Sequence, residues 1–266
     1  MNAPVKTDKM LSRKEGQVGY LTFNNPEKHN AVSLEMWEAA EGFLDEFKND
    51  RNIRVVVVNG AGGKAFVSGA DISKFEKERS DKETSDRYNE AVDRAYGAFY
   101  SFPKPTIAMI RGYCIGGGVG LALSCDLRIC TEGSKFAVPA AKLSIGYRYA
   151  GLKKLVDVVG PAFAKEIFYT ARQFTAQEAL MMGLVNRVLP DGEFDAYVKD
   201  YAETIAGNAP LSVDSVKFIV GQILTDESKR DLAKAEEMVQ ACFASNDFKE
   251  GRTAFMEKRK PKFTGT

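Results

Sequence analysis

The spacing of apolar side chains divides the N-terminal part of the chain into alternating strands and helices. Residues 17–24, QVGYLTFN, alternate apolar and polar positions as a half-buried strand does, and IRVVVVN (53–59) is a β-branched run typical of a buried strand. Between them, Ser33 can cap a helix that runs from Leu34 to about Lys48. We expect the buried face of this helix to carry Leu34, Trp37, Phe43, Leu44 and Phe47.

Residues 81–101 have the apolar spacing of an amphipathic helix. A strand is then predicted over TIAMIRGY (106–113), a helix over 117–124 after three glycines, and a strand over DLRICT (126–131). The earlier loop GAGGKAFVSGADI leads in the same way into a short helix expected near 72–76. Because strand, glycine turn and helix recur, the pattern favours an α/β fold with parallel strands. The apolar face of the amphipathic helix carries Tyr88, Ala91, Val92, Ala95, Tyr96 and Phe99.

The C-terminal part of the sequence is helical in pattern. Thr175 and Glu178 are spaced as a capping box, and Gly183 suits the position just beyond the end of that short helix. We therefore expect an α/β core over 1–190 and a helical C-terminal region over 191–266. The sequence has no low-complexity linker between these parts, so they are expected to pack as one unit. Further helices are predicted over 193–207, 211–224, 228–246 and 247–258.

Composition and charge narrow the class of protein. With 266 residues, 44% hydrophobic and 27% charged, the chain has the composition of a globular enzyme. Its 37 Lys and Arg nearly balance its 36 Asp and Glu, which argues against a surface that binds nucleic acid through phosphates. The N-terminus is polar, and no apolar run approaches the roughly 20 residues that span a bilayer. We expect a cytoplasmic protein with no secretory or membrane segment.

Cysteine and histidine are too few and too scattered to predict a zinc site. The four cysteines form no CxxC pair, and His29 is the single histidine. We expect buried free thiols and no bound metal. The same count excludes Ser-His-Asp or Cys-His catalysis unless His29 is itself the base.

The run CIGGGVG (114–120) requires an explanation, because glycine this dense is entropically costly. Its spacing and mid-chain position do not fit a dinucleotide fingerprint, and no Walker A loop occurs. Close packing is one remaining explanation. The other is an oxyanion hole, because SGAD (68–71) forms a second glycine turn before a helix. Two backbone N–H groups at helix starts can converge on one developing negative charge.

Several motifs, in order along nearly the whole chain, resemble those of the crotonase superfamily, which includes enoyl-CoA hydratases and isomerases. They are NNPEKHNAVS, KAFVSGADI, FPKPTIAMIRGYCIGGGVGLALSCDLRI, FTAQEALMMGLVNRVLP and EGRTAFMEKRKPKF. The resemblance implies a spiral of ββα repeats, an acyl-CoA substrate with no permanently bound cofactor, and a homotrimer or hexamer. It also implies that the backbone N–H groups of Ala70 and Gly117 hold the thioester oxygen while an enolate forms.

The same resemblance implies where coenzyme A (CoA) binds. The strip from Lys28 to Ala31 and residues 64–66 would follow its adenosine and phosphates. The C-terminal helices would supply an aromatic residue and a lysine to the site of a neighbouring subunit. The implied CoA-binding residues are Lys28, His29, Ala31, Lys64, Ala65, Phe66, Asp71, Ile72, Phe255 and Lys258.

Two positions depart from the pattern of the family's hydratases, which have glutamates there. Here they are Gly120 and Ala140, neither of which can act as an acid or base in the addition of water. Tyr147 lies where the family's methylmalonyl-CoA decarboxylases also have a tyrosine, although those enzymes have a histidine in place of Ala70. Loss of CO₂ generates an enolate without a general base, so we favour a lyase reaction such as decarboxylation of a malonyl-type CoA ester. Arg148 is expected at the surface or at a subunit contact.

Other interpretations stay open. The protein could be a 2-enoyl-CoA hydratase of fatty-acid or aromatic-acid degradation, or a non-catalytic relative that binds acyl-CoA. An RNA-binding relative is disfavoured, because the first predicted helix, LEMWEAAEGFLDEF, is acidic.

The charged run at 74–87 could cover the acyl pocket or form a solvated helix face. Asp71 and Asp126 are expected to anchor a helix or strand rather than to perform chemistry.

Overall fold

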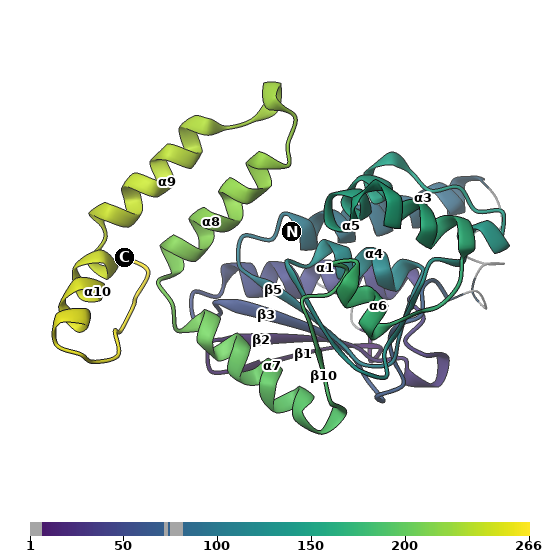
Figure 1. The fold of residues 1–266 in the computed structure, drawn as a ribbon, viewed down its shortest axis with the longest axis horizontal. Coiled ribbons are helices and arrows are strands. Elements are labelled where there is room, and N and C mark those ends of the chain that lie inside the picture. The colour runs from purple at the N-terminus through teal and green to yellow at the C-terminus, as the bar shows by residue number, and fades with distance from the viewer. Residues whose placement is uncertain (1–6, 72–73, 75–81) are drawn as a thin grey trace.

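A computed structural model describes residues 7–71, 74 and 82–266 of the chain. The helix expected near 72–76, which includes Ile72, lies outside the described residues apart from Lys74. Residues 75–81 of the charged run also lie outside them. The described chain forms two β-sheets flanked by helices (Figure 1).

The larger sheet has six strands. In spatial order they are β1 (Met10–Glu15), β2 (Val18–Phe23), β3 (Val55–Gly60), β5 (Thr106–Ile110), β7 (Leu127–Thr131) and β10 (Arg187–Leu189). β1 pairs antiparallel with β2, and every other neighbouring pair is parallel, as the recurring strand and helix pattern predicts. The sequence did not predict β1. Met10 is its only buried side chain, so the strand lacks the alternation of apolar and polar residues that indicates a half-buried strand.

The smaller sheet consists of β4 (Ala65–Val67), β6 (Tyr113–Ile115), β8 (Lys135–Ala137) and β9 (Phe174–Thr175). The single strand expected over 106–113 is wrong, because the chain leaves the large sheet after Ile110 and enters the small sheet at Tyr113. Gly112 makes this crossing at φ +71°, and a Cβ atom there would lie 2.0 Å from the carbonyl oxygen of Lys64. The crossing therefore requires glycine.

Each crossing from the large to the small sheet is followed by a helix. The three helices are α3 (Lys82–Tyr100), α4 (Gly117–Ser124) and α5 (Tyr149–Thr170), the last preceded by the 3₁₀ turn η3 (Pro139–Lys142). α3 follows β3 and β4, α4 follows β5 and β6, and α5 follows β7 and β8. This succession confirms the expected spiral of ββα repeats. The sequence correctly predicted α3 and α4 but not the extent of α5, which bends at Gly160 (φ 75°).

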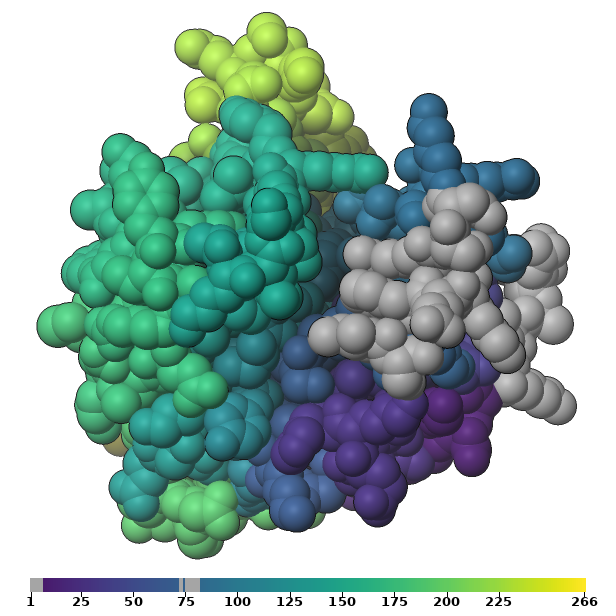
Figure 2. Space-filling view, turned by 90° about the vertical axis from the view of Figure 1, so that its right-hand side faces the viewer, coloured from purple at the N-terminus to yellow at the C-terminus, as the bar shows by residue number. Residues whose placement is uncertain are grey.

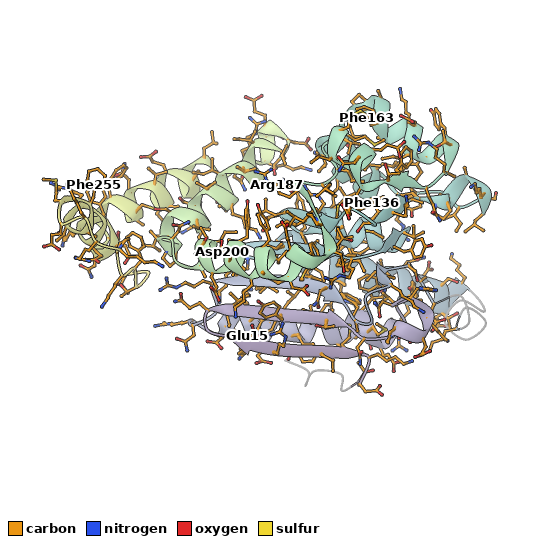
Figure 3. The ribbon with its side chains drawn as sticks, turned by 60° about the horizontal axis from the view of Figure 1, so that its bottom comes forward. Glu15, Phe136, Phe163, Arg187, Asp200 and Phe255 are labelled. Atoms are coloured by element: carbon orange, nitrogen blue, oxygen red, sulfur yellow. The ribbon has the colours of Figure 1, made fainter. Side chains whose placement is uncertain are left out.

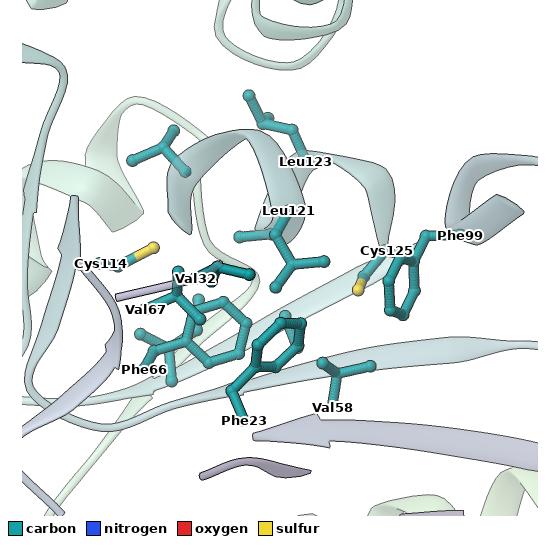
Figure 4. Packing of buried hydrophobic residues seen from close by; sticks show 14 of the residues in the cluster. Phe23, Val32, Val58, Phe66, Val67, Phe99, Cys114, Leu121, Leu123 and Cys125 are labelled. Carbon is teal, nitrogen blue, oxygen red and sulfur yellow. The ribbon is translucent and has the colours of Figure 1, made fainter. Parts of the chain in front are cut away.

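An apolar cluster between the large sheet and α1 (Leu34–Asn49) forms the main core. Figure 4 shows Phe23 of β2, Phe66 of β4 and Leu121 of α4 packed within it. The cluster therefore joins both sheets to the helix that follows the glycine triplet. On the predicted inner face of α1, Trp37, Leu44 and Phe47 are buried, and Leu34 and Phe43 are partly buried.

A second cluster covers the opposite face of the large sheet. Phe194, Val198 and Ala202 of α7 (Asp191–Ala206) pack there against residues such as Tyr20 and Val57. The first helix beyond residue 190 is thus an integral layer of the core.

The remaining helices extend away from the sheets toward one side of the molecule (Figure 1). They are α8 (Pro210–Ile223), α9 (Leu232–Ala244) and α10 (Asn246–Met256). Before them in the chain come the short helix α6 (Ala176–Met181) and then α7. Among the described residues, no helix is both long enough and apolar enough to cross a membrane. Apolar side chains that stay exposed on the projecting helices include Val216, Val220, Ile223, Leu232, Phe243 and Phe255.

Candidate active site

The first glycine turn holds Ala70 against Val32, which lies just before α1. Val32 donates its N–H to the carbonyl of Gly69 at 2.8 Å, and Asp71 donates its N–H to the carbonyl of Val32 at 3.1 Å. In this parallel bridge the N–H of Ala70 is directed away from Val32. Within the described part of the chain, that N–H donates to no protein acceptor. Ala70 therefore has an amide available to a ligand.

The second glycine turn opens α4. Gly116 precedes the helix with φ 55° and donates its N–H to the carbonyl of Ala137 at 2.8 Å. Gly117 is the first helical residue, where an N–H has no intrahelical partner, and it donates to no acceptor among the described residues. The positive end of the α4 dipole adds to the attraction for an anion. Gly118 is also required, because a Cβ atom there would lie 2.0 Å from the carbonyl oxygen of Val67.

The two turns touch each other. A Cβ atom built on Gly69 would lie 3.5 Å from the amide nitrogen of Gly117, and one built on Gly117 would lie 3.5 Å from the Cα of Gly69. The structure thus brings Ala70 and Gly117 together, each with a free backbone N–H. Such a pair can stabilise an oxyanion that forms between them. Their use in catalysis stays a prediction.

Tyr96 occupies the space in front of Gly120, the position at which the resemblance to the family's hydratases implies a glutamate. A Cβ atom on Gly120 would lie 2.9 Å from the Tyr96 hydroxyl oxygen and 3.0 Å from the ring carbon that bears it. The hydroxyl donates to the carbonyl of Gly117 at 2.7 Å, and the ring packs edge-on against Trp37. Burial raises the pKa of Tyr96 well above 10. Ala140, at the other glutamate position, is buried in η3.

Tyr147 lies beside this group, in the loop between η3 and α5. Its ring makes an edge-to-face contact with Phe168 at 4.8 Å between centroids, and burial raises its pKa. Tyr147 also raises the pKa of Tyr96, so the two phenols are electrostatic neighbours. Arg148 forms an ion pair with Asp93 of α3, and both side chains are more than half exposed. The ion pair ties the loop to α3, which agrees with the expected surface role of Arg148.

The molecular surface is hollowed between α3 and the segment that includes η3 and α5. Figure 2 shows a recess between the teal and green surface of the segment that includes η3 and α5 and the blue surface of α3. α4 packs against both α3 and α5, so it lies between the two sides of this recess.

The two segments implied for CoA are fastened to each other by Asn30. Its buried side-chain amide donates to the carbonyls of Ala61 and Ala65 at 2.9 and 2.7 Å, and its oxygen accepts from the N–H of Asn25 at 2.9 Å. This clamp places residues 28–31 beside residues 64–66. The sequence alone does not indicate that Asn30 holds these two segments together.

Within this strip, the predicted residues differ in what they offer a ligand. Lys28 is half exposed and pairs with the buried carboxylate of Asp71 at 3.1 Å, while His29 and Lys64 are exposed. The side chains of Ala31, Ala65 and Phe66 are buried, so these three can reach a ligand only through their backbone. Asp71 anchors the strip, as expected for this acid.

The two residues expected from the C-terminal helices lie far from this strip. Phe255 is on α10, at the opposite end of the molecule from Phe136 and Phe163 (Figure 3), and 83% of it is exposed. Lys258 follows α10 and is also exposed. One chain alone does not bring them to the other predicted CoA residues, and their role at a CoA site stays a prediction.

Other candidate groups have structural roles. Asp126 accepts hydrogen bonds from the N–H and hydroxyl of Thr106 and pairs with Lys217 at 2.7 Å, which fixes β5 beside β7. Burial raises the pKa of Cys125 and of Cys130 to about 12, so these thiols are unreactive. Residues 7–71, 74 and 82–266 contain no cluster of three or more metal-ligating side chains.

The two sheets, the ββα repeats and the touching glycine turns agree with the comparison to known proteins. The chain matches the model of the enoyl-CoA hydratase/isomerase family over residues 13–266, and it belongs to that family. It is 33% identical to the short-chain-enoyl-CoA hydratase of Clostridium acetobutylicum, over 96% of this chain and 97% of that protein. It is 32% identical to the crotonyl-CoA hydratase of Syntrophomonas wolfei, over 96% and 98% of the two chains.

A solved structure shares the whole architecture. The enoyl-CoA hydratase/carnithine racemase of Magnetospirillum magneticum superposes with a TM-score of 0.93 at 36% identity, covering 98% of this chain and 97% of that one. The protein is therefore a crotonase-superfamily acyl-CoA enzyme.

Proposed function

We propose that this enzyme stabilises the enolate of a CoA thioester with the N–H groups of Ala70 and Gly117. The observation that carries the proposal is the contact between the two glycine turns, each of which presents an amide that has no acceptor among residues 7–71, 74 and 82–266. A thioester oxygen bound between them gains negative charge only when the enolate forms. Donors fixed in advance at that point lower the barrier without reorganisation, and one such donor is typically worth about 10² to 10³ in rate.

Hydration of a 2-enoyl-CoA, or the reverse dehydration, is the first reaction that we propose. Relatives that share a third of their residues with this chain over nearly its full length are named as hydratases of short enoyl-CoA esters. Addition of water to the β-carbon produces an enolate that must then take a proton at the α-carbon. Because Gly120 and Ala140 carry no carboxyl group, a group other than these two side chains must supply that proton.

Decarboxylation of a malonyl-type CoA ester is the second candidate. The lack of a carboxyl group at Gly120 and Ala140 favours this reaction, because departure of CO₂ forms the enolate with no general base. The polar, uncharged wall that Tyr96 and Tyr147 form would also accept a substrate carboxylate. Tyr147 would then contact the departing carboxylate, as the resemblance to the decarboxylase branch implies.

A panel of purified esters separates the two reactions. The enzyme would be incubated with crotonyl-CoA, methylmalonyl-CoA and a 3-oxoacyl-CoA, and the products would be followed by liquid chromatography and mass spectrometry. Formation of 3-hydroxybutyryl-CoA supports hydration, and formation of propionyl-CoA supports decarboxylation. Absence of turnover with all esters, together with ordinary binding of CoA, would support the non-catalytic alternative and overturn the proposal.

We also propose that the active form is an oligomer, acting in the cytoplasm, whose C-terminal helices complete the CoA site of a neighbour. The exposure of Phe255 and of the apolar residues on α8 and α9 supports this proposal. A homotrimer or hexamer by light scattering is the expected result. The variant Lys258→Ala should weaken CoA-ester binding without changing the assembly. A monomer that retains full activity would contradict the proposal.

A further inference from the structure

We propose that Tyr96 is the proton donor of this site and takes the place of the carboxyl group that is missing at position 120. This inference rests on the proposed enolate chemistry of Ala70 and Gly117. It adds a specific acid, from a different helix, to a site that otherwise consists of backbone amides.

The geometry places the Tyr96 hydroxyl beside the amide that would hold the thioester oxygen. The hydroxyl oxygen lies 2.7 Å from the carbonyl oxygen of Gly117 and would be 3.2 Å from a Cβ atom on that residue. The α-carbon of a thioester is one bond from the carbonyl carbon whose oxygen the Gly117 N–H would bind. The hydroxyl thus lies against the residue whose N–H would hold the thioester oxygen, and its O–H can rotate from the carbonyl toward an enolate bound there.

The absence of a side chain at position 120 is matched to this ring. The Tyr96 ring fills the volume in front of Gly120 so closely that any Cβ atom there would meet three of its atoms at 2.9–3.1 Å. The ring is held by its edge-on contact with Trp37, at 5.2 Å between centroids. Glycine at 120 and tyrosine at 96 thus form one unit, in which a phenol from α3 replaces a carboxylate from α4.

The surroundings keep the phenol protonated at neutral pH. Burial is the main cause of its raised pKa, and the neighbouring ionisable groups Tyr147, Tyr88, Cys114 and Asp93 raise it further. Each of these neighbours would be negative if ionised, so none favours the phenolate. Tyr96 is therefore an acid rather than a base before the reaction begins.

The proton transfer balances in both proposed reactions. The O–H bond of Tyr96 breaks, its proton bonds to the α-carbon, and the enolate electron pair forms that C–H bond as the thioester carbonyl returns. In hydration, the proton that the attacking water loses on bonding to the β-carbon restores the phenol. In decarboxylation, the electron pair of the broken bond to CO₂ forms the enolate, and a solvent water reprotonates the phenolate. An ester enolate is a much stronger base than a phenolate, so the transfer is downhill.

The first test compares Tyr96→Phe with Tyr100→Phe, which is the same change one turn further along α3. With the ester that the wild-type enzyme turns over, Tyr96→Phe should lower kcat by about 10²- to 10⁴-fold. The dissociation constant for a non-reactive CoA ester should stay within about threefold, because the lost group acts mainly in the transition state. Tyr100→Phe should retain wild-type activity. Thermal unfolding of both variants checks that the fold is intact.

A second test distinguishes a proton donor from a hydroxyl that only positions Gly117. Fluorotyrosine at position 96 keeps the hydrogen bond to Gly117 but lowers the pKa of the phenol. An acid must be protonated, so the rate should fall as pH rises through that lower pKa, whereas the wild-type profile stays flat to higher pH. Coincident pH profiles, or an active wild type with an equally active Tyr96→Phe, would overturn the inference and leave the proposed function standing. A wild type inactive on every ester would reject the proposed function itself.

Discussion

Gly69 and Gly117 lie in contact although 48 residues separate them in the sequence, and a Cβ atom on the first would be 3.5 Å from the amide nitrogen of the second. Gly69 has φ +102°, a conformation that a larger residue reaches only with strain. At Gly117 a side chain would instead meet the Tyr96 hydroxyl at 3.2 Å. The two glycines thus bring the free amides of Ala70 and Gly117 to one point.

Gly117→Pro tests the amide directly. Proline is tolerated at the first position of a helix, and Gly117 is the first residue of α4, so the substitution removes the N–H without breaking the helix, although its Cβ atom would press on the Tyr96 hydroxyl at 3.2 Å. We expect kcat to fall by about 10²- to 10³-fold. Asp191→Pro introduces the same residue at the first position of α7, on the opposite face of the large sheet, and should leave kcat unchanged. Equal activity of the two variants would show that Gly117 donates no hydrogen bond to the transition state.

Asn30→Asp tests the clamp that holds the CoA strip together. The change removes the nitrogen that donates to two carbonyls and places a carboxylate against them at a fully buried position. We expect the free energy of unfolding to fall by about 3 kcal/mol or more, because a buried charge would be left without a partner. Affinity for CoA esters should fall as well. Urea denaturation and calorimetric titration measure the two effects.

Asn49→Asp provides the control for this prediction. Asn49 also donates its side-chain nitrogen to a carbonyl, that of Asp45, but it does so at an exposed helix end. Its substitution should change stability by less than about 0.5 kcal/mol. A similar loss in both variants would mean that the interior position of Asn30 has no special role.

The sequence predicts the repeat of this fold well, because periodicity and glycine turns are local signals. The helix at 81–101 and the capping box at Thr175 both occur in the structure, with Thr175 accepting from Glu178 and Glu178 accepting in return. The predicted cap at Ser33 does not form, since its hydroxyl bonds to the side chain of Glu35 instead. The choice between these partners depends on packing that the local pattern does not contain.

The backbone amides of the site could be predicted from the sequence. The side chains that meet there from distant parts of the chain could not. Glycine runs before helices indicate free amides, so Ala70 and Gly117 follow from the sequence. In the sequence, Tyr96 is one of several apolar positions on an amphipathic helix. Only the packing of α3 on α4 shows that its ring fills the space at Gly120.

Glu178 makes the stability of the fold sensitive to acid. Its hydrogen bonds to the Thr175 backbone, to Arg172 and to the Thr175 hydroxyl lower its pKa to about 2, from the ordinary value of 4.5. A carboxyl group with a lowered folded pKa stabilises the folded state above its unfolded pKa, and that contribution is lost as pH falls from 4.5 through 2. The urea midpoint of the wild type should therefore decline over this interval more steeply than that of Glu178→Gln. Parallel curves for the two proteins would contradict this prediction.

Gly120→Glu tests whether position 120 can be returned to carboxylate chemistry. Alone, the substitution forces a side chain against the Tyr96 ring, so we expect the free energy of unfolding to fall by about 1–3 kcal/mol. Combined with Tyr96→Ala, which vacates the ring volume, the glutamate should fit without the clash, so the double variant should be at least as stable as Tyr96→Ala alone. Gly192→Glu is the control, because a Cβ atom there meets nothing within 4 Å.

The double variant also reports on the reaction. A glutamate beside the two amides supplies the acid and base that addition of water needs, which is typically worth about 10²- to 10⁴-fold. Hydration of crotonyl-CoA by Tyr96→Ala/Gly120→Glu should therefore exceed that by Tyr96→Ala alone, and the difference should vanish at a pH low enough to protonate the glutamate. The absorbance of the enoyl thioester gives both rates directly. If the double variant folds as stably as Tyr96→Ala and hydrates no faster than that single variant, the space in front of Gly120 does not face the reacting carbons.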